Sequence, residues 1–221
     1  FRRRPYWQPW MFDQELHIPS MEGRDLFKNA VTPPAIRDRA TRHRGLAILF
    51  GDGAGALVMR KHETPGHGLI GAKVRSDGNF AKQIYIEGGG FRRRPYWQPW
   101  MFDKEMHIPS MEGRDLFKNA VTKLPRVVRD LCREHGVELS QIDWFIAHQA
   151  NDRINGAVRE ALGVPDEKVP SNIARYGNTS GATIPILMDE LRRAGTVKSG
   201  DLLCFLALGA GLHWGAALMR L

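Results

Sequence analysis

Residues 142–162 of this chain have the sequence IDWFIAHQANDRINGAVREAL. The first part, residues 142–147, is apolar and has the length of a buried strand. The second part, residues 152–162, places apolar side chains at helical spacing, and Gly163 follows as a helix stop. The polar segment that begins at His148 therefore lies at a strand-to-helix junction, and this alternation predicts an α/β fold.

Other segments extend the same alternation along the chain. Further strands are expected at residues 45–50, 54–60, 69–74, 83–87, 202–208 and 214–218. The first two should form a tight pair around the Gly-rich turn 51–55, which we interpret as close backbone packing beneath a site. A long amphipathic helix is expected after the N-cap Ser110, with Pro125 kinking or splitting it. Another helix is expected at residues 181–194, with Pro185 in its first turn.

Composition bounds the class of protein. The chain has 221 residues, 43% of them hydrophobic, which is enough for a real core. The sequence shows no membrane-spanning run and no signal-peptide pattern, and the two cysteines do not form a disulfide framework, so a cytoplasmic location is expected. The net charge of +8 suggests acidic partners. Nucleic acid is not expected, because no nucleic-acid-binding motif is present.

An internal repeat divides the chain. Residues 1–32 and 91–122 are the same sequence except for Gln14 versus Lys104 and Leu16 versus Met106. So close a copy indicates a recent duplication, a recombined gene or an assembly error rather than a structural repeat. We expect residues 1–40 to be poorly packed, or to compete with the second copy for one docking site, and residues 41–221 to form the domain. Residues 91–109 should be a loop over the substrate entrance or a surface flap.

Two polar residues could perform chemistry together. His148 follows one strand, and Asn178 lies in the turn Gly177-Asn178-Thr179-Ser180 before a helix. Two hydrogen-bond donors that converge on one oxygen would stabilise an enolate. No Cys/His cluster has the spacing of a zinc site, so no metal is expected.

These motifs, with Gly51-Asp52-Gly53-Ala54-Gly55 and Gly209-Ala210-Gly211, resemble the C-terminal half of a β-ketoacyl-acyl-carrier-protein synthase III of the thiolase superfamily. The resemblance covers about residues 44–221. It implies a layered αβαβα fold, of which this chain carries mainly the C-terminal half. It also implies decarboxylating Claisen condensation of an acyl thioester with malonyl-acyl carrier protein in fatty-acid synthesis, an acyltransferase activity.

The resemblance assigns roles to individual residues. His148 and Asn178 would be catalytic, donating to the thioester oxygen of a malonyl group. Ala210 would stand in the bend whose backbone N–H contributes to the oxyanion hole for the acyl group. The residues implied in binding coenzyme A or phosphopantetheine are Arg44, Gly45, Gly113, Phe117, Ala150, Asn151 and Arg153. No permanently bound cofactor is implied; acyl-CoA and malonyl-acyl carrier protein are substrates, the carrier is a partner, and a homodimer is implied with no membrane contact.

Neither cysteine matches the family's nucleophile. Cys132 lies within a helical pattern and Cys204 within an apolar strand, and both are interpreted as small buried hydrophobes. This chain alone is therefore expected to be inactive in condensation. Three alternatives stay open: acyl-CoA condensation or acyl transfer in a natural-product pathway, a non-catalytic module that binds coenzyme A or acyl carrier protein, and a truncated product without a function of its own.

Overall fold

The computed structural model describes residues 44–58, 64–89, 94 and 96–221. The expectations for residues 1–40, which concern the first copy of the repeat and its packing, lie outside the described residues.

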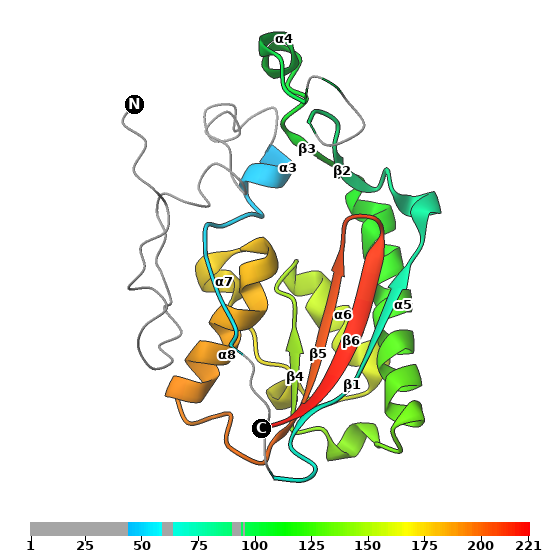
Figure 1. Cartoon of the computed structure of the whole chain (residues 1–221), viewed down its shortest axis with the longest axis vertical. Helices are drawn as coiled ribbons and strands as arrows, with labels where there is room; N and C mark the ends of the chain where they lie inside the picture. Colours follow the sequence, from blue (N-terminus) through cyan, green and yellow to red (C-terminus); the bar gives the residue numbers. More distant parts are fainter. Residues whose placement is uncertain (1–43, 59–63, 90–93, 95) are drawn as a thin grey trace.

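A four-stranded mixed sheet forms the centre of the molecule (Figure 1). Its strands, in spatial order, are β1 (Gly68–Ser76), β6 (His213–Arg220), β5 (Leu202–Gly209) and β4 (Trp144–Ala147). β6 is antiparallel to both of its neighbours, whereas β4 runs parallel to β5. The strands expected from the sequence at these positions are confirmed, with boundaries that differ by a few residues.

Two helices cover one face of the sheet, α5 (Gly113–Glu134) and α6 (Asp152–Leu162). Because successive side chains of a strand point to opposite faces of the sheet, only alternate residues contact these helices. Phe145 and Ala147 of β4 belong to this core, together with Leu206 of β5. Gly163 ends α6 with a φ of 72°, the left-handed stop expected there. α5 runs unbroken through Pro125, so of the two outcomes expected at this proline, a kink or a split, the split is wrong. We attribute its continuity to the apolar face that α5 buries along the sheet.

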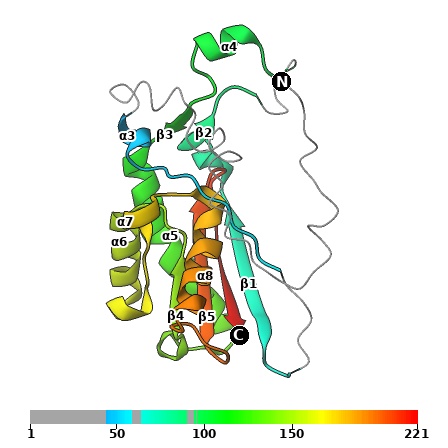
Figure 2. The same cartoon turned by 90° about the vertical axis from the view of Figure 1, so that its left-hand side faces the viewer.

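The opposite face of the sheet is covered beside β4 by α8 (Thr183–Arg193). Ile146 and Leu203, the strand residues that point away from α5, pack with Leu187 and Met188 of α8. α8 follows a short 3-10 turn, Ser180–Ala182, and Pro185 stands at the third position of the helix, within its first turn as expected. The fold is therefore layered α/β, with helices on both faces (Figures 1 and 2).

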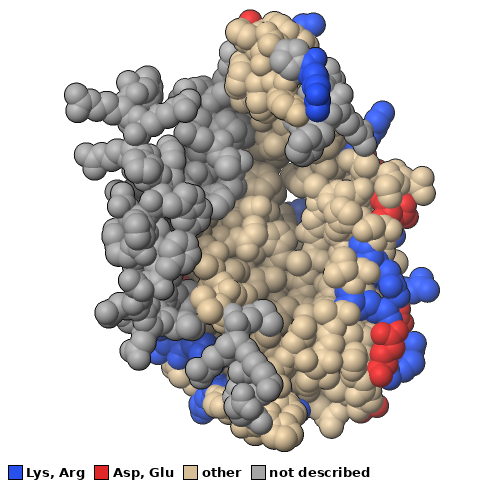
Figure 3. Space-filling view, viewed as in Figure 1, with Lys and Arg blue, Asp and Glu red and all other residues tan. Residues whose placement is uncertain are grey.

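Among the described elements, no helix packs over the part of that opposite face formed by β1 and β6. An open, mainly apolar groove follows β1, β6 and β5 there, and its lining includes Ala72, Val74, Phe205 and Ala217. Figure 3 looks onto the molecule as in Figure 1; charged side chains are sparse over the middle of this view and gather at the edge along α5.

The described part of the second copy of the repeat is divided: residues 96–111 belong to an arm beyond the end of the sheet, whereas residues 113–122 form the first half of α5. The arm holds α4 (Pro99–Asp103) and β3 (Pro109–Met111), and β3 pairs with β2 (Ile84–Ile86). Ser110 lies within β3, and the N-cap of α5 is Glu112, so the expected capping role of Ser110 is wrong. Pairing with Tyr85 fixes Ser110 in an extended backbone and moves the helix start onward. Figures 1 and 2 show α4 at the far end of this arm.

The strand pair expected at residues 45–50 and 54–60 is also wrong for the residues described. Arg44–Ala47 form the short helix α3, and residues 51–58 have no regular structure. A strand needs neighbours for its backbone groups, and within the described part of the chain Phe50 forms a single bridge, with Asn178. An apolar pattern alone does not make a strand, and no strand of the described residues pairs with residues 45–58 beyond this bridge.

The remaining short elements connect these parts: 3-10 turns at Gly78–Phe80, Leu139–Gln141 and Asp166–Lys168, and the helix α7 (Ile173–Tyr176). Among the described residues, no helix has both the length and the apolar character needed to cross a membrane.

The burial of α5 on the sheet gives a stability prediction. Val128 of α5 is fully buried, whereas Val74 of β1 is 70% exposed. Val128→Ala should lower the free energy of unfolding by about 2 kcal/mol, because it removes buried methyl groups and leaves a gap. Val74→Ala, the same chemical change at an exposed site, should alter it by less than about 0.5 kcal/mol. Urea unfolding followed by circular dichroism measures both, and equal effects would contradict this packing.

Candidate active site

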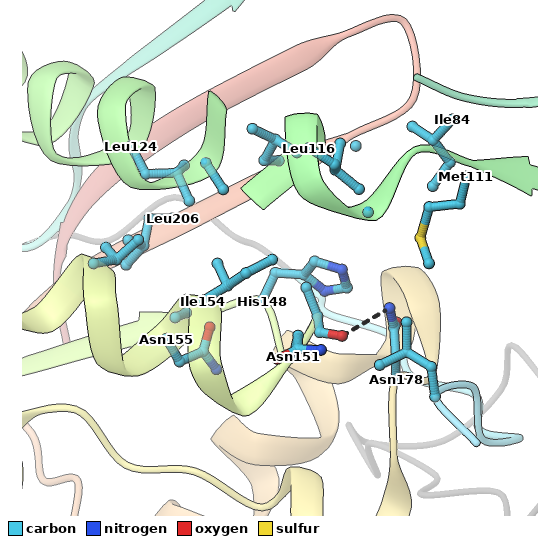
Figure 4. Close-up of a pocket in the computed structure, with 18 of the residues that line it drawn as sticks. Ile84, Met111, Leu116, Leu124, His148, Asn151, Ile154, Asn155, Asn178 and Leu206 are labelled. Atoms are coloured by element: carbon cyan, nitrogen blue, oxygen red, sulfur yellow. Dashed lines mark hydrogen bonds between the residues drawn. The ribbon is translucent and has the colours of Figure 1, made fainter. Parts of the chain in front are cut away.

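A largely apolar cavity of about 100 Å³ opens where β4 and β5 end, between the N-terminal halves of α5 and α6 (Figure 4). Its walls come from α5 (Leu116, Ala120 and Leu124), from α6 (Ile154 and Val158), and from Ile84 and Met111 of the β2–β3 arm. His148 and Asn178 both lie in its wall, although they come from separate junctions of the chain. Of the residues predicted from the sequence, the cavity brings together Gly113, His148, Ala150, Asn151 and Asn178.

The other predicted residues do not line this cavity. Arg153 is exposed on the first turn of α6. Phe117 is 36% exposed, because Leu116 takes the inward position on that turn of α5. Ala210 is exposed in the β5–β6 turn, and its neighbour Gly209 lines the cavity instead. Arg44 and Gly45 belong to α3, and Gly45 is exposed.

The orientation of the Asn178 amide is fixed by its neighbours. The backbone N–H of Ser180 donates to Asn178 Oδ1 at 2.8 Å, so this end of the amide is the oxygen. The Nδ2 group is therefore the donor, and it lies 3.4 Å from the carbonyl oxygen of Ala150 (Figure 4). Ser180 achieves this contact with a φ of 57°, a left-handed backbone conformation that is uncommon outside glycine and that often occurs at functional sites.

The backbone of Asn178 is hydrogen-bonded to the segment around Gly51. Gly51 N–H donates to the carbonyl oxygen of Asn178 at 3.0 Å, and Asn178 N–H donates to that of Leu49 at 2.9 Å. A Cβ atom on Gly51 would lie 1.7 Å from the carbonyl oxygen of Tyr176, so a side chain has no room there. The prediction that the Gly-rich turn is close backbone packing beneath the site is confirmed.

His148 is positioned by both its backbone and its ring. Its N–H donates to the carbonyl oxygen of Leu206 at 2.8 Å, which continues the pairing of β4 with β5 by one residue. Nδ1 of the ring lies 2.6 Å from the hydroxyl oxygen of Thr183 at the start of α8. Burial lowers the pKa of the imidazole from 6.5 to about 4, so the ring is neutral at physiological pH.

The residues between His148 and α6 are fixed by further hydrogen bonds. Gln149 is fully buried; its Nε2 donates to the carbonyl oxygen of Ala147, and its Oε1 accepts from the Ser171 hydroxyl at 2.8 Å. Asn151 caps α6, because its Oδ1 accepts from the N–H of Arg153 at 2.9 Å. The junction is thus rigid where the chemistry would occur.

Neither cysteine is available as a nucleophile. Cys132 and Cys204 are both buried in the core and do not line the cavity, as the sequence predicted. Burial, with a smaller contribution from Glu138, raises the pKa of the Cys132 thiol. The pKa of the Cys204 thiol is also raised, mainly by burial and to a smaller extent by Cys132. Both thiols therefore stay protonated and unreactive.

Sequence reasoning missed several residues of the site. Thr183 and Ser180 orient the two polar side chains. Ser180 belongs to the motif around Asn178, but no signal in the sequence gives either residue this role. Leu116, in contrast, could have been found, because it shares a helical face with Ala120 and Leu124.

The arrangement can stabilise negative charge on an oxygen. A neutral imidazole and a carboxamide open into one cavity with an apolar wall, where hydrogen bonds are stronger than in water. Within the described ranges, no three His, Cys, Asp or Glu side chains gather in a way that could hold a metal ion.

The chain is similar to known proteins over most of its length. Residues 132–221 match the family described as 3-oxoacyl-[acyl-carrier-protein (ACP)] synthase III C terminal, and residues 32–78 match 3-oxoacyl-[acyl-carrier-protein (ACP)] synthase III. A β-ketoacyl-[acyl-carrier-protein] synthase III of Coxiella burnetii is 41% identical over 180 residues, which cover 81% of this chain and 53% of the relative. The chain thus spans about half the length of the curated relatives it matches.

Solved structures agree in fold. The 3-oxoacyl-[acyl-carrier-protein] synthase III of Aquifex aeolicus has a TM-score of 0.71 and 36% identity, over 80% of this chain and 52% of the other. The β-ketoacyl-[acyl carrier protein] synthase III of Thermus thermophilus has the same score and identity, over 80% of this chain and 53% of the other. The expected thiolase-like fold is confirmed. With its motifs, its layers and these matches in agreement, the chain belongs to the 3-oxoacyl-[acyl-carrier-protein] synthase III family and carries the family's C-terminal part.

Proposed function

We propose that this chain provides the decarboxylating half-site of a 3-oxoacyl-[acyl-carrier-protein] synthase III, which condenses an acyl thioester with malonyl-acyl carrier protein in fatty-acid synthesis. One observation carries the proposal: the side chains of His148 and Asn178 open into the same apolar cavity, and hydrogen bonds from residues outside the cavity orient both.

The chemistry follows from the two donors. When the malonyl carboxylate leaves as CO₂, the electron pair of the broken C–C bond moves toward the thioester carbonyl and forms an enolate. Nε2–H of His148 and Nδ2–H of Asn178 would donate to the enolate oxygen, where negative charge develops. The apolar walls of α5 and α6 would limit access of water and favour loss of CO₂ from the buried carboxylate.

Condensation needs an acyl group held on a thiol, and no cysteine of the described residues lines the cavity. We therefore separate the reaction into two parts. Decarboxylation is assigned to this chain, whereas neither of its two cysteines is placed to hold the acyl group.

The position of Arg153 favours a substrate that carries phosphate groups. Arg153 lies exposed at the first turn of α6, where the positive end of the helix dipole also favours an anion, and the chain as a whole carries a net charge of +8. The proposed ligands are the phosphates of coenzyme A or of the carrier's phosphopantetheine, with Ala150 and Asn151 lining the path of the thiol arm into the cavity.

A second candidate function is a binding module without catalysis. The observation in its favour is the burial of both cysteines away from the cavity. Such a module would keep the exposed Arg153 and bind coenzyme A or acyl carrier protein, while the cavity would turn nothing over.

Malonyl-CoA decarboxylation by the purified chain separates these candidates. His148→Ala and Asn178→Ala should each lower the rate by about 100-fold or more, because each removes one donor from the enolate oxygen. His135→Ala and Asn79→Ala are matched controls, since both residues are exposed and outside the cavity, and they should leave the rate unchanged. A folded chain that releases no CO₂ above the control without protein would favour the binding module.

Carrier binding tests the role of Arg153. Arg153→Glu should weaken binding of acyl carrier protein roughly tenfold and reduce its dependence on salt, because it reverses a charge that faces phosphate. Arg192→Glu, at the exposed end of α8, makes the same change away from the cavity and should have little effect. Calorimetric titrations at two salt concentrations measure both; equal weakening by the two variants would argue against this surface.

The pKa of His148 gives a pH-dependent stability. Between pH 6.5 and about 4, the unfolded chain binds a proton on this ring that the folded chain does not, so the free energy of unfolding falls as the pH falls. At pH 5 this loss should be about 2 kcal/mol relative to pH 7, and His148→Gln should lack it. Urea unfolding of both proteins at the two pH values measures the difference, and parallel pH profiles would refute it.

A further inference from the structure

A single proton on the Thr183 hydroxyl has two neighbouring acceptors. The hydroxyl oxygen lies 2.6 Å from Nδ1 of His148 and 3.0 Å from the carbonyl oxygen of Ser180. Because a hydroxyl has one proton, it can donate to one of them at a time. If it donates to Ser180, then His148 must donate from Nδ1, and Nε2 becomes an acceptor. If it donates to His148, then Nε2 carries the ring proton.

The distances favour donation to His148. A separation of 2.6 Å falls within the range of hydrogen bonds donated by a hydroxyl, and it is shorter than those usually donated by a ring or backbone N–H. The 3.0 Å separation from the Ser180 oxygen lies at the long end of the hydroxyl range.

The other hydrogen bonds of the two acceptors also favour donation to His148. The carbonyl oxygen of Ser180 already accepts the backbone N–H of Thr183, at the end of the 3-10 turn that precedes α8. Nδ1 of His148, in contrast, has the Thr183 hydroxyl as its hydrogen-bond partner within the described part of the chain. Donation to His148 therefore leaves neither group unsatisfied, and the hydroxyl proton is used where it is needed.

We propose that Thr183 is a positioning residue of this site: its hydroxyl donates to Nδ1 of His148 and holds the neutral ring with its proton on Nε2. The inference rests on the proposed function, since it specifies which end of the ring donates. Thr183 itself lines the open groove on the other side of His148 and is not among the residues lining the cavity.

The consequence for the reaction is direct. In the opposite tautomer, Nε2 would present a lone pair to the developing enolate oxygen and would repel it. A neutral ring carries a proton on only one of its two nitrogens. With its pKa near 4, the ring does not gain a second proton at neutral pH. The hydroxyl of Thr183 thus decides whether His148 can act as a donor at all.

Nitrogen NMR of the full chain labelled with ¹⁵N-histidine tests the proposal without relying on activity. At neutral pH, His148 should show a protonated Nε2 and an unprotonated Nδ1, its signals being identified by their loss in His148→Gln. Thr183→Val keeps the shape of this buried side chain but removes the hydroxyl, and it should shift part of the population from Nε2–H to Nδ1–H. Thr183→Ser restores a hydroxyl and should restore the preference.

Kinetics give the second measurement. Thr183→Val should lower kcat for malonyl-CoA decarboxylation roughly tenfold with little change in KM, and Thr183→Ser should recover most of it. A protonated Nδ1 in the wild-type chain, or an unchanged tautomer in Thr183→Val, would overturn the proposal. If the tautomer follows the hydroxyl as expected but no variant decarboxylates malonyl-CoA, then the positioning role stands and the proposed function fails.

Discussion

The left-handed backbone of Ser180 is the constraint on which the site depends. Its N–H fixes the amide of Asn178, and its carbonyl oxygen closes the 3-10 turn that places Thr183 beside the ring of His148. His148 and Asn178 must both donate toward the cavity, and each is oriented by a hydrogen bond to a residue outside the cavity. The strain of a φ of 57° is thus located where orientation matters most. Both polar residues would lose their alignment together if this turn relaxed.

The sheet and its helices bring that turn to the right place. The parallel pairing of β4 with β5 extends to His148, and buried Gln149 ties the following residues to Ser171. α6 then begins at its Asn151 cap, so the chain leaves the cavity at a fixed angle. The apolar faces of α5 and α6 close the cavity from the side. A packed core on one face of the sheet therefore supports the position of two hydrogen-bond donors at its end.

The sequence anticipated much of this fold for identifiable reasons. β4, α6 and the Gly163 stop are set by local patterns, which carry their own signals of burial and helix termination. The expectations failed where partners decide the outcome. Residues 54–58 belong to a segment expected to be a strand but have no neighbouring strand among the residues described, and Ser110 pairs with β2 instead of capping α5. Pro125 remains within α5, which packs along the sheet on both sides of that residue.

By itself, the sequence determined the identity of the chemical groups: a histidine and an asparagine at two junctions, one cysteine in a helical pattern and one in an apolar strand, and the alternation of strands with helices. The tertiary structure alone decided that His148 and Asn178 share a cavity, that Phe117 and Ala210 do not line it, and that Ser180 and Thr183 set the direction of the donors. The physical reason is that residue type and spacing are local properties, whereas a hydrogen bond between residues 35 positions apart exists only after the sheet and α8 have packed.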